Sequence, residues 1–427
     1  MTQQSIDAIS IIGAGVTGIA CAQHMRKNGY KGKISIFDKS GSSGGRLISK
    51  KSIDGNFVYE MGAGRFHEKQ HPQVNALCRE FNLAVSPFSY QAVYSQIGSR
   101  CSENVNSRQM LEDILELAPL YIGKNKPFHE FCVGNFGEDV LEALTLQSGY
   151  NTLKHPKLPV EGGIGILCHH PETHSLFKGN MDGWFYIKDG FQQLPNKLYE
   201  QVRGNVDIQL NTNLHKVEDD HTGGYSLILE KNGQQTRLHA DSVIMATPLQ
   251  DIGKVEGVNN ITRSPLCLDM QSVPLVKGFI KFDRAWWNDF GYSNQCVIGD
   301  SIIRKLYLSD RHNLAWFYCD GDSAITLGKI LEAGDNLTAF ALIMDHLGVR
   351  ATPEIKEYQW KFWERGISFD AKNNAIKDFA EIAPNFLVCS DVLTENLGWI
   401  EGGLTSGRAA AVHLCKKWSQ HQMEISI

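Results

Sequence analysis

Several features that would assign this chain to a broad class of protein are missing. No run of about 18 apolar residues occurs, so no membrane-spanning helix is predicted. The ten cysteines include no Cys-x-x-Cys pair and do not group with histidines, which gives no metal-ligand or disulfide pattern. This usage favours reduced thiols and a cytoplasmic location. There is no long basic run, and a net charge of −5 does not favour a nucleic-acid partner.

The remaining composition is that of an ordinary globular protein. The 427 residues are 42% hydrophobic and 21% charged, which is enough for a large core and for two or three subdomains. The apolar N-terminal stretch Ile6–Ala22 lacks the basic residues that open a signal peptide. We therefore expect this stretch to form a buried strand and helix.

A glycine-rich turn lies between that strand and that helix. Gly13, Gly15 and Gly18 have the spacing G-x-G-x-x-G after the predicted strand Ala8–Ile12, and Asp38 ends the next apolar run. Such a turn brings backbone N–H groups to a pyrophosphate at a helix N-terminus, and the acid binds the ribose hydroxyls. This pattern predicts a dinucleotide site; an ordinary tight turn is the alternative.

Two further glycine motifs refine this prediction. Gly44-Gly45-Arg46 resembles the second pyrophosphate-contacting turn of the flavin amine oxidase family, with Arg46 as the counter-charge, and favours FAD over NAD. A solvated glycine loop is the alternative interpretation. Gly62-Ala63-Gly64-Arg65 follows and adds a third glycine-rich approach to the cofactor.

Similar strings continue to the end of the chain. In order they are Gly62–Phe66, Ser148–Tyr150, His170–Glu172, Pro274–Phe279, Arg304–Tyr307, Phe317-Tyr318 and Ser390–Gly403. They resemble the L-amino acid oxidases of the flavin amine oxidase family, and above all its L-tryptophan oxidases of secondary metabolism. Thr152 departs from the resemblance, because a smaller side chain is expected there, and this leaves the side-chain preference of the pocket open.

The resemblance implies an FAD-dependent L-amino acid oxidase. Such an enzyme transfers a hydride from Cα of its substrate to flavin N5 and gives the 2-imino acid and H₂O₂, with O₂ as the acceptor. We expect an aromatic L-amino acid, with L-tryptophan favoured. The alternatives are a broad-specificity L-amino acid oxidase, an oxidase of carboxylate-free amines and a flavin-binding protein without turnover. The resemblance also suggests a loose homodimer, and a downstream pathway enzyme could receive the imine.

The same resemblance assigns roles in catalysis. Arg65 would bind the substrate carboxylate through two parallel hydrogen bonds, and Tyr318 would add another. Lys277 would reach flavin N5 through a water and help O₂ to accept electrons. The structural alternatives are an ion pair for Arg65, a packed strand tyrosine and a surface lysine.

Further residues are assigned to the pocket and the cofactor. Tyr150 and His170 would line the substrate pocket, Trp399 would form an aromatic wall, and Trp363 would be a second wall or plain core. Asp391 would bind the ribityl chain. The stretch Trp360–Ile367 contains no cysteine, so a non-covalent flavin is expected. The predicted cofactor contacts are Gly13, Gly15, Gly18, Asp38, Lys39, Gly45, Arg46, Gly62, Ala63, Gly64, Arg65, Val217 (through its backbone), Asp391, Trp399 and Ile400.

The periodicity and the resemblance together predict an α/β fold of the two-domain amine oxidase type. Its Rossmann-like FAD-binding domain is discontinuous and comprises residues 1–65, 190–260 and 375–427. A mixed-sheet substrate domain comprises 66–99, 151–189 and 261–374, and a small helical subdomain covers 100–150. Asn232-Gly233 predicts a hairpin turn between the strands Tyr225–Lys231 and Thr236–Ala240, and Gly402–Trp418 predicts a C-terminal helix.

Overall fold

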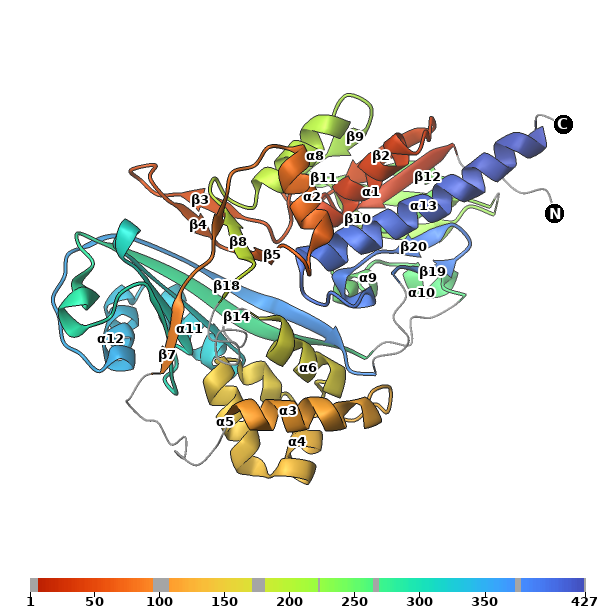
Figure 1. Cartoon of the computed structure of the whole chain (residues 1–427). Helices are drawn as coiled ribbons and strands as arrows, with labels where there is room; N and C mark the ends of the chain where they lie inside the picture. Colours follow the sequence, from red (N-terminus) through yellow and green to blue (C-terminus); the bar gives the residue numbers. More distant parts are fainter. Residues whose placement is uncertain are drawn as a thin grey trace.

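A six-stranded sheet organises the N- and C-terminal parts of the chain. The computed structural model describes residues 7–94, 107–170, 181–221, 223–263, 269–372 and 378–425 (Figure 1). The strand order is β19-β20-β13-β1-β2-β9, and all neighbours are parallel except β19 and β20. The strands are β1 Ala8–Ile12, β2 Lys33–Phe37, β9 Asp207–Gln209, β13 Ser242–Met245, β19 Ala380–Ala383 and β20 Phe386–Val388.

Both faces of this sheet are covered, as expected for a parallel sheet of near-continuous apolar strands. Helices α1 (Val16–Lys27), α8 (Gln193–Val202) and α13 (Ile400–Ile425) pack on one face around Ile9 and Ile11. The opposite face packs against a three-stranded antiparallel sheet. Three chain segments that lie far apart in the sequence therefore share one core (Figure 1).

The covering sheet contains the predicted hairpin. Its strands are β10 Asn213–Asp219, β11 Tyr225–Lys231 and β12 Gln234–Ala240. Asn232 and Gly233 both have positive φ, 52° and 74°, which matches a turn that twists with the flanking strands. The hairpin prediction is confirmed. Nearby short helices are α9 Leu249–Ile252 and α10 Val258–Ile261.

A second six-stranded sheet, of mixed direction, forms the other half of the molecule. Its order is β18-β14-β17-β16-β15-β7. The strands are β7 Gln91–Tyr94, β14 Met270–Phe282, β15 Gln295–Ile298, β16 Lys305–Ser309, β17 Leu314–Asp320 and β18 Ile355–Asp370. Helices α11 (Asp322–Glu332) and α12 (Asn336–Leu347) cover one face, and Trp286 and Trp287 lie in that core. The opposite face presents Phe279 and Trp316.

A helical cluster packs below this sheet (Figure 1). It contains α3 Ser107–Leu117, α4 Phe128–Phe136, α5 Glu138–Ser148 and α6 Val160–His169. The short helix η2 (Asn151–Lys154) and α6 share its hydrophobic core, so the cluster continues past residue 150. Buried Asp320 at the end of β17 fixes η2 by accepting hydrogen bonds from the backbone N–H groups of Asn151 and Thr152, at 2.9 Å each.

Short elements connect the two halves. They are β3 Ser49–Lys51, β4 Val58–Glu60, β5 Phe66–His67, α2 Pro72–Glu80, β6 Val85–Pro87 and β8 Trp184–Ile187. Glu401 at the start of α13 accepts hydrogen bonds from the N–H groups of Gln73 and Val74 at the start of α2. Within the described ranges, no helix is both long and apolar enough to span a bilayer.

Candidate active site

One cavity of about 1440 Å³ lies between the two large sheets. Its wall is built from the glycine-rich turn after β1, the segments around β3, β4 and β14, the helix α6 and the start of α13. The predicted site residues line it, with the exceptions of Gly18 and Val217. The fold thus brings residues from the first 65 positions together with residues near 150, 277, 318 and 399.

A glycine cradle forms one end of this cavity. Gly13 has φ +114°, and a Cβ there would lie 2.6 Å from the carbonyl oxygen of Ala246. Gly15 forms a bridge with Gly44, and Gly45 has φ +62° with an ideal Cβ position 3.3 Å from Cα of Gly15. Side chains at these positions would strain the turn or fill the cradle. The bare backbone next to the N-terminus of α1 suits a pyrophosphate.

The two glycine motifs and the second strand are tied together by hydrogen bonds. The N–H of Gly44 donates to the carbonyl oxygen of Ala14 at 2.9 Å. Asp38 accepts hydrogen bonds from the N–H groups of Ala14 at 2.7 Å and Ser40 at 2.8 Å. Lys39 follows on the surface and lies 3.7 Å from Asp251. Asp38 therefore shapes the turn, and its half-buried carboxylate also lines the cavity at the predicted ribose position.

Gly18 and Val217 lie away from the cavity wall. A Cβ on Gly18 would lie 2.0 Å from the carbonyl oxygen of Gly13, so this glycine allows α1 to pack on the turn. Val217 is fully buried, and its N–H donates to the carbonyl oxygen of Glu256 at 2.9 Å. This N–H therefore has a partner within the protein, and the predicted backbone contact from Val217 to an adenine stays a prediction. Thr212, Asn213 and Leu214 line this part of the cavity instead.

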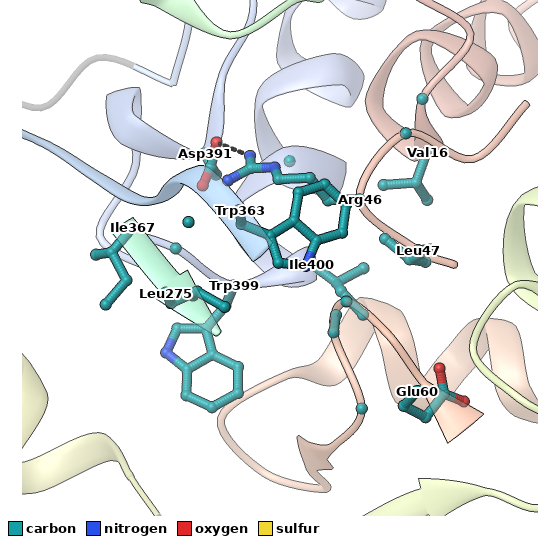
Figure 2. Close-up of a pocket in the computed structure, with 18 of the residues that line it drawn as sticks. Val16, Arg46, Leu47, Glu60, Leu275, Trp363, Ile367, Asp391, Trp399 and Ile400 are labelled. Carbon is teal, nitrogen blue, oxygen red and sulfur yellow. Dashed lines mark hydrogen bonds and ion pairs between the residues drawn. The ribbon is translucent and has the colours of Figure 1, made fainter. Parts of the chain in front are cut away.

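An ion pair that the sequence did not predict crosses the cavity wall. Arg46 donates to Oδ1 of Asp391 at 2.9 Å (Figure 2). Arg46 comes from the second glycine motif and Asp391 from the turn after β20, 345 residues later. The positive end of α13 follows, with Trp399, Ile400 and Gly403 at the wall. Both predicted cofactor contacts thus lie at one place, next to a helix N-terminus that favours negative charge.

Arg65 lies in a cluster of aromatic and hydroxyl groups at the opposite end. Its guanidinium donates to the hydroxyl of Tyr150 at 3.1 Å and to that of Tyr307 at 3.4 Å. It also lies over the ring of Phe88, 5.3 Å from the centroid. The ring centroid of Tyr318 is 5.6 Å from that of Tyr150. The guanidinium is thus oriented by its neighbours before any substrate arrives.

The Tyr318 hydroxyl of this cluster is held in its neutral form. Burial raises the pKa of Tyr318 well above its usual value, and the charge of Asp320 adds to the shift. The Tyr150 hydroxyl lies 2.7 Å from Nδ1 of His170. A cationic guanidinium beside hydroxyl groups is an environment that binds a carboxylate.

Aromatic rings form a third part of the wall. The ring centroid of Trp399 lies 5.2 Å from that of His170, 5.3 Å from that of Trp184 and 4.6 Å from that of His71. Trp363 also lines the cavity, and its Nε1 donates to the carbonyl oxygen of Met61 at 2.7 Å. Figure 2 shows both indole rings within the same pocket. Trp363 is therefore part of the cavity wall. The sequence had left open whether it lies in the wall or in the core.

Lys277 lies against the third glycine motif. Its Nζ donates to the carbonyl oxygens of Glu60 at 2.6 Å and Gly62 at 2.7 Å. Burial lowers the pKa of Lys277, while the nearby charge of Glu60 raises it and that of Arg65 lowers it. The surface-lysine alternative does not fit these contacts.

The sequence interpretation missed two ionisable residues here. Glu60 lines the cavity, and Lys305 lies fully buried with Nζ 3.1 Å from the ring centroid of Tyr150 and 4.3 Å from that of Tyr318. Lys305 stands opposite Tyr318 in the β16–β17 register. The alternation along 305–308 marks a strand, but only the pairing of the strands shows which tyrosine faces the lysine.

The chain is similar to known proteins in both sequence and fold. The sequence model of the family described as "Flavin containing amine oxidoreductase" matches residues 16–415. The chain belongs to this family. A putrescine oxidase triple mutant has a similar structure, with a TM-score of 0.75 and 17% identity over 96% of this chain and 98% of that one. Cyclohexylamine oxidase from Brevibacterium oxydans IH-35A has a TM-score of 0.73 and 15% identity over 97% and 100%.

A third similar structure is the CLA-producing fatty acid isomerase from P. acnes, with a TM-score of 0.68 and 14% identity over 97% of this chain and 99% of that one. At these identities the likeness shows the fold. The predicted two-domain α/β fold of the amine oxidases is thereby confirmed.

Membership of the flavin amine oxidase family implies a flavin cofactor, and the residues present fit one. The cradle at Gly13, Gly15 and Gly45 leaves backbone bare where a Cβ would intrude, and Arg46 supplies a cation beside it. The same cavity of about 1440 Å³ is lined by this cradle and by Lys277 and Trp399.

Proposed function

We propose that this protein is an FAD-dependent L-amino acid oxidase that holds its flavin without a covalent bond. The substrate is an aromatic L-amino acid, with L-tryptophan favoured, and the products are the 2-imino acid and H₂O₂. The observation that carries the proposal is Arg65, a guanidinium in the cavity that is oriented by Tyr150 and Tyr307. An enzyme for carboxylate-free amines has no need of an oriented cation there.

The sequence supports the finer assignment. The strings from Gly62–Phe66 to Ser390–Gly403 resemble the L-tryptophan oxidase of the violacein pathway. The aromatic wall of Trp399, Tyr150 and His170 could stack on an indole or another aromatic ring.

The chain's own residues would perform most of the catalysis by positioning. Arg65 and Tyr318 would bind the carboxylate, and the aromatic wall would hold the side chain. Lys277 lines the same cavity as these two anchors. When bound there, the flavin supplies the acceptor for the hydride from Cα and passes the electrons to O₂. The Lys277 ammonium would favour negative charge that develops on O₂.

A broad-specificity oxidase is the second candidate, and Thr152 favours it. This residue lines the cavity, and its hydroxyl donates to Asp320, which fixes the side chain. A threonine where a smaller residue is expected narrows the pocket, which would favour side chains smaller than an indole. The proposal also includes a cytoplasmic location, a loose homodimer and transfer of the imine to a downstream enzyme.

Anaerobic mixing of the flavin-loaded protein with four amines tests the proposal. L-tryptophan, L-phenylalanine, L-leucine and tryptamine would each be added while flavin absorbance is followed near ~450 nm. We expect L-tryptophan to bleach the flavin fastest and tryptamine to leave it oxidised. Equal bleaching by the three amino acids would indicate broad specificity. Bleaching by tryptamine, or by none of the four, would contradict an amino acid oxidase.

A further inference from the structure

Two ionisable side chains, Glu60 and Lys277, meet beside Gly64, whose ideal Cβ position lies 3.0 Å from Cβ and 3.4 Å from Cγ of Glu60 and close to Nζ of Lys277. The Lys277 ammonium uses two of its three N–H groups on the carbonyl oxygens of Glu60 and Gly62. Its Nζ lies 3.4 Å from the ideal Cβ position of Gly64, so a larger residue there would crowd it. The backbone therefore fixes where the ammonium points, and Lys277 lines the cavity at that place.

Hydrogen bonds also hold the Glu60 side chain in one position. Its carboxyl oxygens accept hydrogen bonds from the N–H of Phe191 at 2.7 Å and the hydroxyl of Ser49 at 2.9 Å. The N–H of Gln192 donates in turn to Ser49. Figure 2 shows Glu60 among the residues that line the pocket. Two donors favour the ionised carboxyl, although burial opposes ionisation.

The charge on each of these two side chains shifts the pKa of the other. Burial raises the pKa of Glu60 and lowers the pKa of Lys277, so both pKa values come closer to neutral pH. The Lys277 cation lowers the pKa of Glu60, and the Glu60 anion raises the pKa of Lys277, so each charge opposes the effect of burial on the other group. An isolated buried ion would lose its charge, but a buried pair can retain both.

Carbonyl oxygens and the rings of Phe279 and Trp316 also favour the Lys277 cation, but the other ionisable groups around it supply no negative charge. Arg65 follows on the same segment and lowers the pKa of Lys277. Tyr318 on β17 and Lys361 on β18 stand opposite Lys277 in the sheet register. Arg65 and Lys361 are cations and Tyr318 is neutral, so they do not stabilise an ammonium. Among the described ionisable groups around Lys277, Glu60 carries the charge that does.

We propose that Glu60 is a positioning residue that keeps Lys277 protonated where it faces the cavity. The two side chains form a pair that holds its proton on Lys277 while Glu60 is ionised. Neutralising Glu60 releases the proton from Lys277 and removes the positive charge beside the reacting atoms. This inference deepens the proposed function, because the charge on Lys277 is what would assist the reaction with O₂. It gives Glu60 a role that no sequence motif indicated.

A pH titration of the flavin absorbance tests the pair without any substrate. The flavin serves as a reporter of charge near Lys277 in the flavin-loaded, full-length protein. Glu60→Gln should move the titration of the site to lower pH by at least one unit, a tenfold loss of proton affinity at Lys277. Lys277→Met should move the remaining titration to higher pH, because Glu60 loses its cation. The double variant should lose the titration that the Glu60–Lys277 pair gives.

Glu357→Gln is the matched control. Glu357 is also a buried carboxylate, on β18, and it accepts a hydrogen bond from the N–H of Ile53. This variant should titrate like the wild type. If Glu60→Gln does not fold, the upward shift in Lys277→Met still decides the question.

Two results would overturn the proposal. They are an unchanged titration in Glu60→Gln or Lys277→Met, and a wild-type titration in the double variant. Because no amine is present, these results are separate from the outcome of the substrate panel. A protein that oxidises no amino acid could still show the pair.

Discussion

At the scale of single residues, the neighbours of Arg65 hold its guanidinium in the orientation that a carboxylate would need. Its guanidinium is half-buried, bonded to two tyrosine hydroxyls and stacked on Phe88. A charged group held in this way loses little freedom when a carboxylate binds, because its orientation is already fixed. The same contacts make the group sensitive to replacement by lysine or methionine.

Arg65→Met should separate substrates with and without a carboxylate. We expect KM for L-tryptophan to rise about 100-fold, because a charge-assisted pair of hydrogen bonds is lost. The reaction with tryptamine, however slow, should change less than about threefold, since it makes no such bonds. Steady-state kinetics with both amines measures this. Tyr307→Phe, which removes only one partner of Arg65, is the control and should raise KM by less than about tenfold. Equal losses for both amines would contradict the carboxylate role.

At the scale of elements, the turn from β1 to α1 is the most constrained part of the cofactor end. Gly13→Ala places a Cβ 2.6 Å from a backbone oxygen at a residue with φ +114°. We expect this variant to be purified with little or no flavin, because the turn must move away from the cradle. Gly29→Ala is the control. Its φ is +84°, but no atom lies within 4 Å of the new Cβ.

Comparing Gly13→Ala with Gly29→Ala separates the strain of a positive φ from the clash of the new Cβ with neighbouring atoms. Gly29→Ala should cost about 1 kcal/mol of stability and keep its flavin. The ratio of absorbance near ~450 nm to that at ~280 nm measures the flavin content. A Gly13→Ala protein with full flavin content would show that this turn does not hold the cofactor.

The attachment of α13 to the sheet edge predicts a pH effect. Glu381 on β19 lies 3.2 Å from His413 and 2.6 Å from Lys417 of that helix. The bond from His413, with those from Lys417 and Asn385, lowers the pKa of Glu381 to about 2 against the opposing effect of burial. A carboxyl whose pKa is lower in the folded state stabilises the fold above its unfolded value. That stability is lost as pH falls toward about 2.

Glu381→Gln removes this pH dependence. The wild type should be about 1–2 kcal/mol more stable than the variant at neutral pH, after allowance for partial exposure. The difference should disappear as pH falls from about 5 to about 2, while Glu381 becomes protonated. Urea unfolding at a series of pH values measures this. A difference that stays constant with pH would indicate a packing effect instead.

At the scale of the whole molecule, the cavity joins parts of the chain that are distant in sequence. The nucleotide end comes from the segments near 13, 45 and 391, and the substrate end from those near 65, 150, 277 and 318. A ligand that fills this space contacts both sheets and the helical cluster at once. We therefore expect the flavin to stabilise the entire chain and not only the glycine-rich end.

Removal of the flavin should lower the unfolding temperature. A ligand present at 100 times its Kd adds about 2.7 kcal/mol to the free energy of unfolding by mass action. Differential scanning calorimetry of the flavin-free and reconstituted proteins measures the shift. Titration with FAD should restore the original transition, and NAD is the control, which should not. An unchanged transition after flavin removal would show that the cofactor does not bridge the two halves.

The sequence alone determined the parts of the site that depend on local backbone. The three glycine motifs, the Asn232-Gly233 hairpin and the strand–helix alternation follow from short-range sterics and periodicity, and the structure places them as expected. The family resemblance supplied Arg65, Lys277 and Tyr318, which no local pattern could have marked, and all three line the cavity.

Only the tertiary structure decided the partners of these residues. The Arg46–Asp391 pair joins positions 345 residues apart, and the contacts of Lys277 with the segment 60–64 depend on how β14 lies against β4. The hydrogen bond from the N–H of Val217 to the carbonyl oxygen of Glu256 is another contact that the sequence did not indicate. Charges and hydrogen bonds act over a few ångströms in space, so their effects appear only when distant segments are brought together.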